Sequence, residues 1–350
     1  MSKMDIKSMH DGELSAIFKE WGMPAFRTKQ IRNWLDNGAT SFDQMNNLPA
    51  TLRQQLSEHF RIPSVKILRR LVSQIDDTTK YLFELEDGQT VESVLMKYKH
   101  GWSQCLSTQV GCRMGCSFCA TGIDGLARDL LPSEMIAQIE AAEADRGIRV
   151  SSVVLMGMGE PLDNYENVLR FLEMLETEGG VHIGMRHVSL STCGLVDRIY
   201  DLMEKDLQIT LSISLHAPND ELRRRLMPVA RKWSVDELLA ACKAYTDRTG
   251  RRISYEYAMI DGVNDTDACA LELVKRLRGT LCHINLIPAN AVEGKTQRRS
   301  SKARLQRFTE ILTNGGLNAT VRRTLGSDIN ASCGQLRRSQ EQGIEQQFAD

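Results

Sequence analysis

The first 60 residues carry apolar side chains at the spacing of amphipathic helices. Three segments show it, LSAIFKEWG, FRTKQIRNWLDNG and LPATLRQQLSEHF, and glycines and prolines separate them. Apolar residues that recur every three or four positions cover one face of a helix, and Gly and Pro end such helices. The pattern predicts a small helical N-terminal domain over residues 1–60.

Residues 61–97 change to a pattern typical of β-strands. VKILRRLVSQ, KYLFELEDGQ and TVESVLMKY are rich in Val, Ile, Tyr and Phe, and an Asp-Gly pair lies before the last of them. β-branched and aromatic residues favour strands, and Asp-Gly favours a hairpin turn. We expect a short β-hairpin linker over these residues.

From Cys105 onward, short apolar strands alternate with amphipathic helices. The expected strands cover residues 105–110, 152–157, 187–192, 209–215, 253–260 and 283–288. The expected helices lie near residues 133–146, 164–177, 195–204, 219–248, 266–278 and 300–314. Ser234 followed by Glu237 has the pattern of a capping box at a helix start. Six β/α units predict an α/β fold whose parallel sheet curves into a partial (β/α)6 barrel. This core covers residues 98–328, and residues 329–350 follow it as a C-terminal segment.

The composition also predicts the cellular compartment of the protein. No apolar run approaches the ~18 residues of a membrane span, and the N-terminus lacks the apolar core of a signal peptide, so we expect a cytoplasmic protein. Its nine cysteines are then unlike a disulfide framework, because the cytosol is reducing. Some of them should bind metal or take part in catalysis.

The net charge of −1 hides a basic stretch. Residues 295–338 hold ten basic and two acidic side chains, and such an excess favours contacts with nucleic-acid phosphates. The main candidates for these contacts are Arg298, Arg299, Arg322 and Arg323. Further candidates are Lys97, Lys99, Arg223–Arg225 and Arg251–Arg252. Solvated helix faces are the alternative for each of them.

Chemically distinctive side chains follow the ends of the predicted strands. In chain order these are Cys112, Cys116, Cys119, Gly159, Glu160, Ser191, Ser214, Leu215, His216 and Asn290. In parallel α/β folds, ligands bind beyond the carboxyl ends of the strands. The sequence therefore predicts that one catalytic centre gathers these residues.

The three cysteines of CRMGCSFC are one short of a closed metal site, which usually takes four protein ligands. Three thiolates on one tight loop can hold three irons of a [4Fe-4S] cluster, and the fourth iron then stays open to another ligand. A structural zinc site that uses Cys105 or His100 as its fourth ligand is the alternative.

The C-x3-C-x2-C spacing after a first barrel strand resembles the radical S-adenosylmethionine (SAM) superfamily, in which SAM binds the open iron. Further segments extend the resemblance over nearly the whole chain: CLSTQVGCRMGCSFCATG, MGMGEPLDNYENV, LSISLHAPNDELR, INLIPAN and SDINASCGQL. Together they are similar to the RlmN/Cfr family of radical SAM RNA methyltransferases. The resemblance implies that Gly159 and Glu160 bind the SAM amino group and that Ser191, Ser214, Leu215, His216 and Asn290 make further SAM contacts.

The resemblance also implies a catalytic scheme that uses two SAM per turnover. Cys333 would carry a methyl group as S-methylcysteine, Glu92 would accept a proton from the base, and Cys105 would form a transient disulfide with Cys333 to release the product. The remaining cysteines, Cys193, Cys242, Cys269 and Cys282, match no catalytic position and are expected to pack in the core.

The implied substrate is C2 of adenosine, in the peptidyl-transferase region of 23S rRNA and 3′ to the anticodon in tRNA. The implied partners are these RNAs and a flavodoxin-type electron donor, and we expect a monomer. Two alternatives stay open on the sequence. One is an adenine C8 methyltransferase of the Cfr type, which confers antibiotic resistance, and the other is a non-catalytic, zinc-dependent RNA-binding protein.

Overall fold

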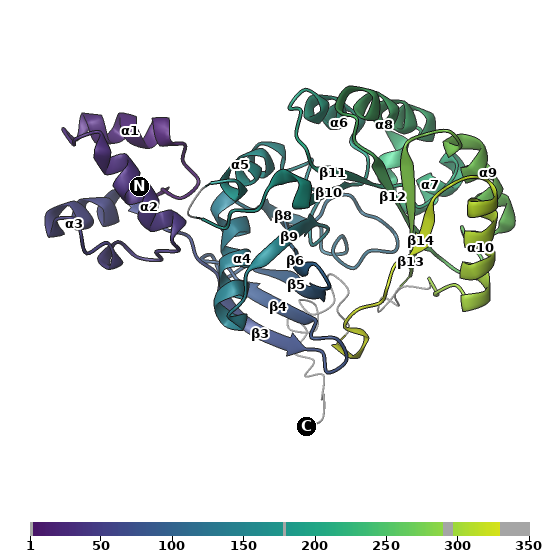
Figure 1. The fold of residues 1–350 in the computed structure, drawn as a ribbon, viewed down its shortest axis with the longest axis horizontal. Helices are drawn as coiled ribbons and strands as arrows, with labels where there is room; N and C mark the ends of the chain where they lie inside the picture. The colour runs from purple at the N-terminus through teal and green to yellow at the C-terminus, as the bar shows by residue number, and fades with distance from the viewer. Residues whose placement is uncertain (1–2, 178–179, 290–296, 330–350) are drawn as a thin grey trace.

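The computed structural model describes residues 3–177, 180–289 and 297–329, and its largest part is a curved sheet with helices along the outer face (Figure 1). Within these residues the sheet has ten strands in the order β14-β13-β12-β11-β10-β9-β6-β5-β4-β3. Neighbouring strands from β14 to β6 are parallel, and those from β6 to β3 are antiparallel. The strands are β3 Lys66–Val72, β4 Thr79–Glu84, β5 Thr90–Tyr98, β6 Gly101–Cys105, β9 Val150–Leu155, β10 Val188–Thr192, β11 Thr210–Ser214, β12 Ile253–Met259, β13 Cys282–Pro288 and β14 Ala319–Val321.

Helices connect each parallel strand to the next. They are α4 Pro132–Arg146, α5 Tyr165–Leu175, α6 Val196–Met203, α7 Asp220–Leu226 with α8 Val235–Thr249, α9 Asp267–Leu277 and α10 Lys302–Asn314. Leu190 and Ile213 on the strands belong to one core with Phe171 and Leu238 on the helices, and all four are completely buried. The α/β class with a partial barrel is therefore confirmed, and β14 and β3 form the two edges of the sheet among the described residues.

Two expected elements of the barrel were wrong. The strand expected over residues 105–110 ends at Cys105 instead, because the Thr108 and Gln109 N–H groups turn to the Met158 carbonyl (2.8 and 3.2 Å). The helix expected over residues 219–248 is divided into α7 and α8 by the 3₁₀ turn Pro228–Arg231. Proline has no N–H group to donate within a helix, so a continuous helix does not pass through Pro228. The second helix, α8, begins at the expected capping box.

That capping box is confirmed: Ser234 Oγ accepts from the Glu237 N–H, and Glu237 Oε2 accepts from the Ser234 N–H. Strand β14 was not expected, because three residues are too few to show a period. The hairpin strands expected over residues 61–97 are present as the antiparallel neighbours β3, β4 and β5. Strands β3, β4 and β5 hydrogen-bond onto β6 and so continue the main sheet.

The N-terminal part has its own small core. Its helices are α1 Asp11–Glu20, α2 Phe26–Asp36 and α3 Ala50–His59, and β1 Met4–Asp5 pairs with β2 Phe60–Arg61. Leu14, Ile31 and Leu56 are completely buried within it. Polar contacts attach it to the barrel, including Lys7 Nζ to Glu140 Oε1 (2.6 Å) on α4. None of the described helices is long and apolar enough to cross a membrane.

After β14 the chain crosses to the turn between β3 and β4. Asp328 accepts from the Ser73 hydroxyl (2.7 Å) and the Gln74 N–H (2.9 Å), and the Gly326 N–H donates to Asp76 Oδ2 (2.9 Å). Leu325 packs against the side-chain cluster that contains Cys105. The chain therefore passes the sheet face of Cys105 shortly before Cys333, which lies outside the described residues.

Candidate functional site

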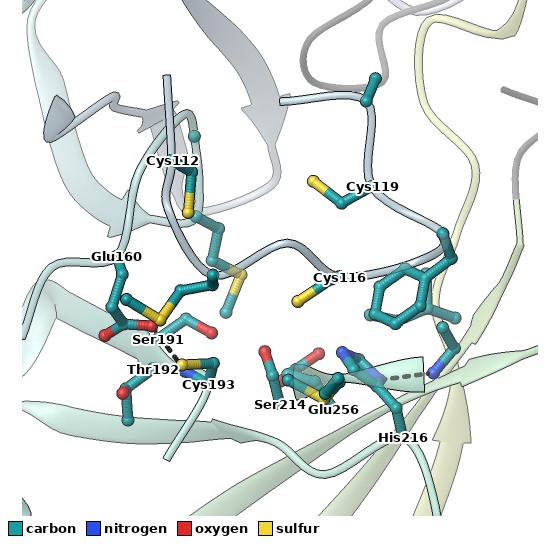
Figure 2. A pocket seen from close by; sticks show the side chains of 18 of the residues that line it. Cys112, Cys116, Cys119, Glu160, Ser191, Thr192, Cys193, Ser214, His216 and Glu256 are labelled. Atoms are coloured by element: carbon teal, nitrogen blue, oxygen red, sulfur yellow. Dashed lines mark hydrogen bonds between the residues drawn. The ribbon is translucent and has the colours of Figure 1, made fainter. Parts of the chain in front are cut away.

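A cavity of about 310 Å³ opens at the carboxyl ends of the parallel strands. Figure 2 shows Cys112, Cys116 and Cys119 above it, and strand-end side chains below. The residues predicted to bind the cluster or SAM that line it are Cys112, Cys116, Cys119, Gly159, Glu160, Ser191, Ser214 and His216. The structure thus brings together residues that are spread over about a hundred positions of sequence, as the strand-end rule predicts.

The cysteine loop projects from a small hairpin of β7 Gln109–Gly111 and β8 Leu126–Asp129. At its base Gly111 has φ +80°, and an added Cβ would lie 2.0 Å from the Gly125 carbonyl oxygen. Only glycine fits there. On the other side of the loop, the Ser117 N–H donates to the Leu226 carbonyl at the end of α7 (2.8 Å). The loop is therefore held at its base and again between Cys116 and Cys119.

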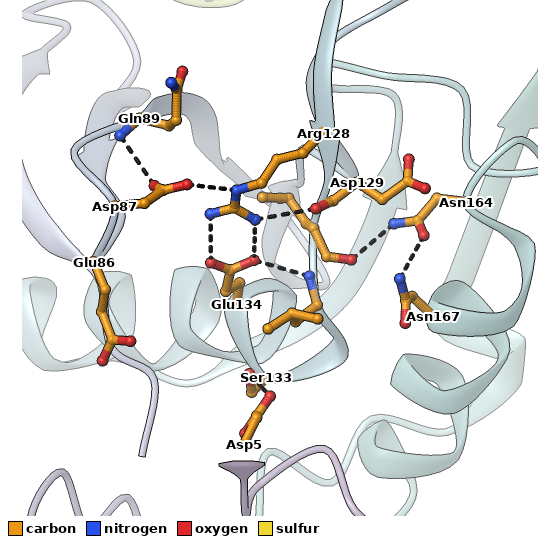
Figure 3. A network of polar contacts seen from close by, with 12 residues as sticks. Asp5, Glu86, Asp87, Gln89, Arg128, Asp129, Ser133, Glu134, Asn164 and Asn167 are labelled. Atoms are coloured by element: carbon orange, nitrogen blue, oxygen red, sulfur yellow. Dashed lines mark hydrogen bonds and ion pairs between the residues drawn. The ribbon is translucent and has the colours of Figure 1, made fainter. Parts of the chain in front are cut away.

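A network around Arg128 holds this hairpin to the sheet (Figure 3). The guanidinium forms a two-pronged contact with Glu134 (2.8 Å twice) at the start of α4, and Nε donates to Asp87 (2.6 Å) in the β4–β5 turn. Bidentate arginine–carboxylate pairs are strongly directional. The base of the cysteine loop is therefore anchored to the helix and to the antiparallel strands.

The cysteine loop offers three thiols, Cys112, Cys116 and Cys119, at the cavity. Among the described residues, no three His, Cys, Asp or Glu side chains are grouped closely enough to hold a single ion. Burial raises the pKa of Cys112 to about 12 and that of Cys116 further, so metal binding must displace their protons. His100, one candidate fourth ligand for zinc, instead stacks on Tyr98 at 5.3 Å and is not part of the cavity wall. The donor set fits a three-cysteine iron–sulfur cluster.

Gly159 and Glu160 form the turn after β9. Gly159 has φ +108°, and an added Cβ would lie 2.8 Å from the backbone nitrogen of Gln109. Glu160 is buried, accepts from the N–H groups of Cys193 (2.7 Å) and Leu162 (3.0 Å), and borders the cavity. Burial raises the pKa of Glu160, and the N–H donors oppose that shift. A carboxylate fixed in this way is suited to an ammonium group.

His216 has a left-handed backbone (φ +56°) and an imidazole that is held as a neutral ring. Its Nδ1 accepts from the Ala258 N–H (2.9 Å), which leaves the proton on Nε2. Burial and, to a smaller extent, the nearby charge of Arg223 lower the pKa of His216 to about 3. Figure 2 shows the ring facing the cavity. His216 can therefore donate one hydrogen bond without carrying charge.

Not every predicted contact is at the cavity. Leu215 is buried in the main core and does not line the cavity, since it lies on the opposite face from its neighbours Ser214 and His216. Asn290 lies outside the described residues. Sequence reasoning placed Thr192 with Ser191 at the rim, but it missed Cys193 and Glu256, which also line the cavity. Cys193 was assigned to packing alone, and only the rim position after β10 could have indicated more.

Glu92 and Cys105 lie on one face of the sheet, next to the cavity. Cys105 pairs with Val94 across β5 and β6, and Glu92 is two residues before Val94, so their side chains point to the same side. Glu92 is buried and forms an ion pair with Lys80 Nζ (3.0 Å). Cys105 packs against Met156, which lines the cavity.

The basic candidates divide into two groups. Arg298, Arg299 and Arg323 are exposed, whereas Arg322 lines the cavity itself. Arg223 was wrong as a phosphate contact, because it is completely buried and donates to backbone carbonyls. A short helix buries about one side chain per turn. When three arginines stand in a row, the sequence does not show which of them is the buried one.

This fold and site define a radical SAM enzyme. Residues 106–274 match the Radical SAM superfamily, and residues 4–62 match the family described as the ribosomal RNA large subunit methyltransferase N-terminal domain. The crystal structure of a radical SAM methyltransferase from Sphaerobacter thermophilus is similar, with 43% identity, a TM-score of 0.89 and coverage of 95% of this chain and 98% of that one.

Curated relatives narrow the class to one family. A probable dual-specificity RNA methyltransferase RlmN of Clostridium botulinum (strain Eklund 17B / Type B) is 52% identical, over 93% of this chain and 94% of its own. A protein of the same name from Alkaliphilus oremlandii is 50% identical, over 97% and 98%. The chain belongs to the RlmN family.

Proposed function

We propose that this protein is a SAM-dependent RNA methyltransferase that methylates C2 of adenosine in the peptidyl-transferase region of 23S rRNA and 3′ to the anticodon in tRNA. The observation that carries the proposal is the 52% identity to an RlmN protein over 93% of the chain, through both family regions. The division into residues 1–60, 61–97, 98–328 and 329–350 remains part of this proposal.

Cys112, Cys116 and Cys119 hold the [4Fe-4S] cluster in this proposal. Gly159 and Glu160 bind the amino group of SAM, and Ser191, Ser214 and His216 offer hydroxyl and imidazole groups to the rest of the cofactor. When bound, the cluster and SAM supply a methyl group to Cys333 and a carbon radical that makes this methyl group able to add to adenine C2. Such chemistry suits C2, an electron-poor carbon between two ring nitrogens.

Glu92 and Cys105 complete the reaction. The radical adduct would lose one electron, which returns to the oxidised cluster, and the C2 proton, which Glu92 takes. The Cys105 thiolate would then attack the Cys333 sulfur: the bond from that sulfur to the methylene carbon breaks, a disulfide forms, and the methylene carbon takes up a proton to become the methyl group of the released base. Their shared sheet face next to the cavity supports these roles. Lys80 at 3.0 Å balances the charge of the Glu92 carboxylate in a buried site. The path of residues 325–328 beside Cys105 supports the approach of Cys333.

We assign the RNA contacts to positively charged side chains. Arg298, Arg299 and Arg323 are exposed, and Arg322 lines the cavity where the base would enter. Because C2 lies on the base-pairing edge, the adenine must leave its stack and pair before it reaches the site. The N-terminal helical domain is the proposed adaptor for the RNA, the protein acts as a monomer, and a flavodoxin-type protein donates the electrons.

The test is transfer of labelled methyl groups to RNA. The wild-type protein is reconstituted anaerobically with iron and sulfide and given unmodified 23S rRNA, methyl-labelled SAM and a reductant. Label should enter RNA with wild type and with Cys282→Ala, whose thiol is buried in the core, but not with Cys119→Ala. Equal labelling by Cys119→Ala, or none by the wild-type holoenzyme, would contradict the proposal.

A further inference from the structure

Arg223 is a completely buried cation on α7, without a carboxylate partner among the described residues. Its Nη2 donates to the Cys193 carbonyl (2.6 Å), and its Nε donates to the Leu215 carbonyl (3.2 Å). Nη1 is buried and has no hydrogen-bond partner among the described residues. The carbonyls therefore accept only some of the hydrogen bonds that the guanidinium can donate, and they do not balance its positive charge.

The position of Arg223 is immediately behind the cavity. The carbonyls it binds follow β10 and β11, whose end residues line the cavity, and the same helix receives the Ser117 N–H of the cysteine loop at Leu226. Gly194 gives it room, since an added Cβ there would lie 3.2 Å from Nη2. Cys116 packs in the hydrophobic cluster of Leu226 and Met227. One helix thus joins the buried charge to the loop of thiols.

A buried guanidinium without a counter-charge is costly. The described part of the structure offers it three backbone carbonyls and an unpaired donor. An anion that occupies the cavity would supply the negative charge that these neutral carbonyls lack. An iron–sulfur cluster held by three thiolates is such an anion, and it becomes more negative by one charge on reduction.

We propose that Arg223 is a positioning residue with a second, electrostatic role: it holds the strand ends behind the cavity and makes the bound cluster easier to reduce. This rests on the cluster of the proposed function, and not on the identity of the RNA. Reduction potentials of such clusters respond to local charge and hydrogen bonds. A fixed positive charge in a low-dielectric wall favours the more negative, reduced cluster.

The experiment measures the reduction potential of the reconstituted cluster by anaerobic titration, with the reduced form followed by electron paramagnetic resonance. Arg223→Gln removes the charge and keeps donors for the carbonyls, and Arg223→Lys keeps the charge. Arg223→Met is the second neutral variant, because replacing a buried charge by an apolar side chain of similar length is often tolerated. Arg224→Gln is the matched control, since Arg224 is the next residue and its side chain is 53% exposed.

The neutral variants should bind iron as wild type does, and their equilibrium constant for one-electron reduction should fall about tenfold, or about 59 mV. Arg223→Lys and Arg224→Gln should stay close to wild type. An unchanged potential in a neutral variant with full iron content would overturn the role of Arg223 and leave the methyltransferase proposal intact. An equal fall of the reduction equilibrium constant in Arg223→Lys would also overturn this role. It would show that the shape of the arginine side chain, and not its charge, sets the potential. Wild-type protein that assembles no cluster would overturn both.

Discussion

Gly159→Ala tests the geometry of the cavity at its tightest turn. Alanine at φ +108° carries backbone strain of roughly 1–2 kcal/mol. Its Cβ would also lie 2.7 Å from Gln109 Cβ, 2.8 Å from Gln109 N and 2.8 Å from Thr108 Oγ1, and the backbone fixes the positions of the two Gln109 atoms. The chain must shift, which breaks or lengthens the hydrogen bonds from Thr108 and Gln109 to the Met158 carbonyl.

Together, the backbone strain and the steric contacts should cause a substantial loss of stability. Two weakened backbone hydrogen bonds are worth about 1 kcal/mol each, so we expect Gly159→Ala to lower the free energy of unfolding by about 3–4 kcal/mol. Gly147→Ala is the matched control: Gly147 ends α4 at φ +61°, with nothing within 4 Å of an added Cβ. It carries the backbone strain alone, about 1 kcal/mol.

The assay is urea unfolding of the cluster-free proteins, followed by circular dichroism. Gly159→Ala should unfold at clearly lower urea than Gly147→Ala, and it should also bind SAM more weakly after reconstitution, because the Glu160 N–H donates to the displaced Gln109 side chain (2.8 Å). Equal losses of stability in the two variants would refute the reasoning, since steric contact is the difference between them.

Three further predictions concern the chemistry and its surroundings. Cys105→Ala should accumulate a covalent protein–RNA adduct, visible as a slow band on denaturing gels, and release of methylated RNA at the wild-type rate would count against Cys105 as the resolving thiol. Asp328→Asn should speed hydrogen exchange at the Gln74 amide and slow methyl transfer several-fold, because it weakens the anchor of the segment before Cys333; unchanged exchange would argue against that anchor. His216 has a folded pKa of about 3 against 6.5 when unfolded. Below pH 6.5 the unfolded state therefore takes up the proton, and stability should fall with pH down to about 3, by about 2 kcal/mol at pH 5. His216→Asn should lose less between pH 7.5 and 5, and an identical loss would be inconsistent with a buried neutral ring.

The sequence predicted the repeating part of the fold well, because a period in the apolar positions records which face is buried. The β/α alternation from β9 to α10 and the capping box at Ser234 are of this kind. The end of β6 at Cys105 and the division between α7 and α8 were missed, since contacts distant in sequence decide them. Thr108 leaves the strand direction to bind the Met158 carbonyl, 50 residues away.

The site divides in the same way. The rim positions of Cys112, Glu160 and Ser214 follow from strand order, and the structure places them around one cavity. The burial of Arg223 could not be predicted, because it depends on the space beside Gly194 and on carbonyls from two different strands. The roles of Cys333 and Glu92 came from resemblance, and they remain proposals.

The most direct test of the central claim is the identity of the modified nucleoside. Unmodified 23S rRNA is incubated with the reconstituted protein, SAM and a reductant, digested to nucleosides, and compared by mass spectrometry and retention time with authentic standards. The account predicts 2-methyladenosine. Appearance of 8-methyladenosine, or cleavage of SAM with no methylated adenosine, would contradict it.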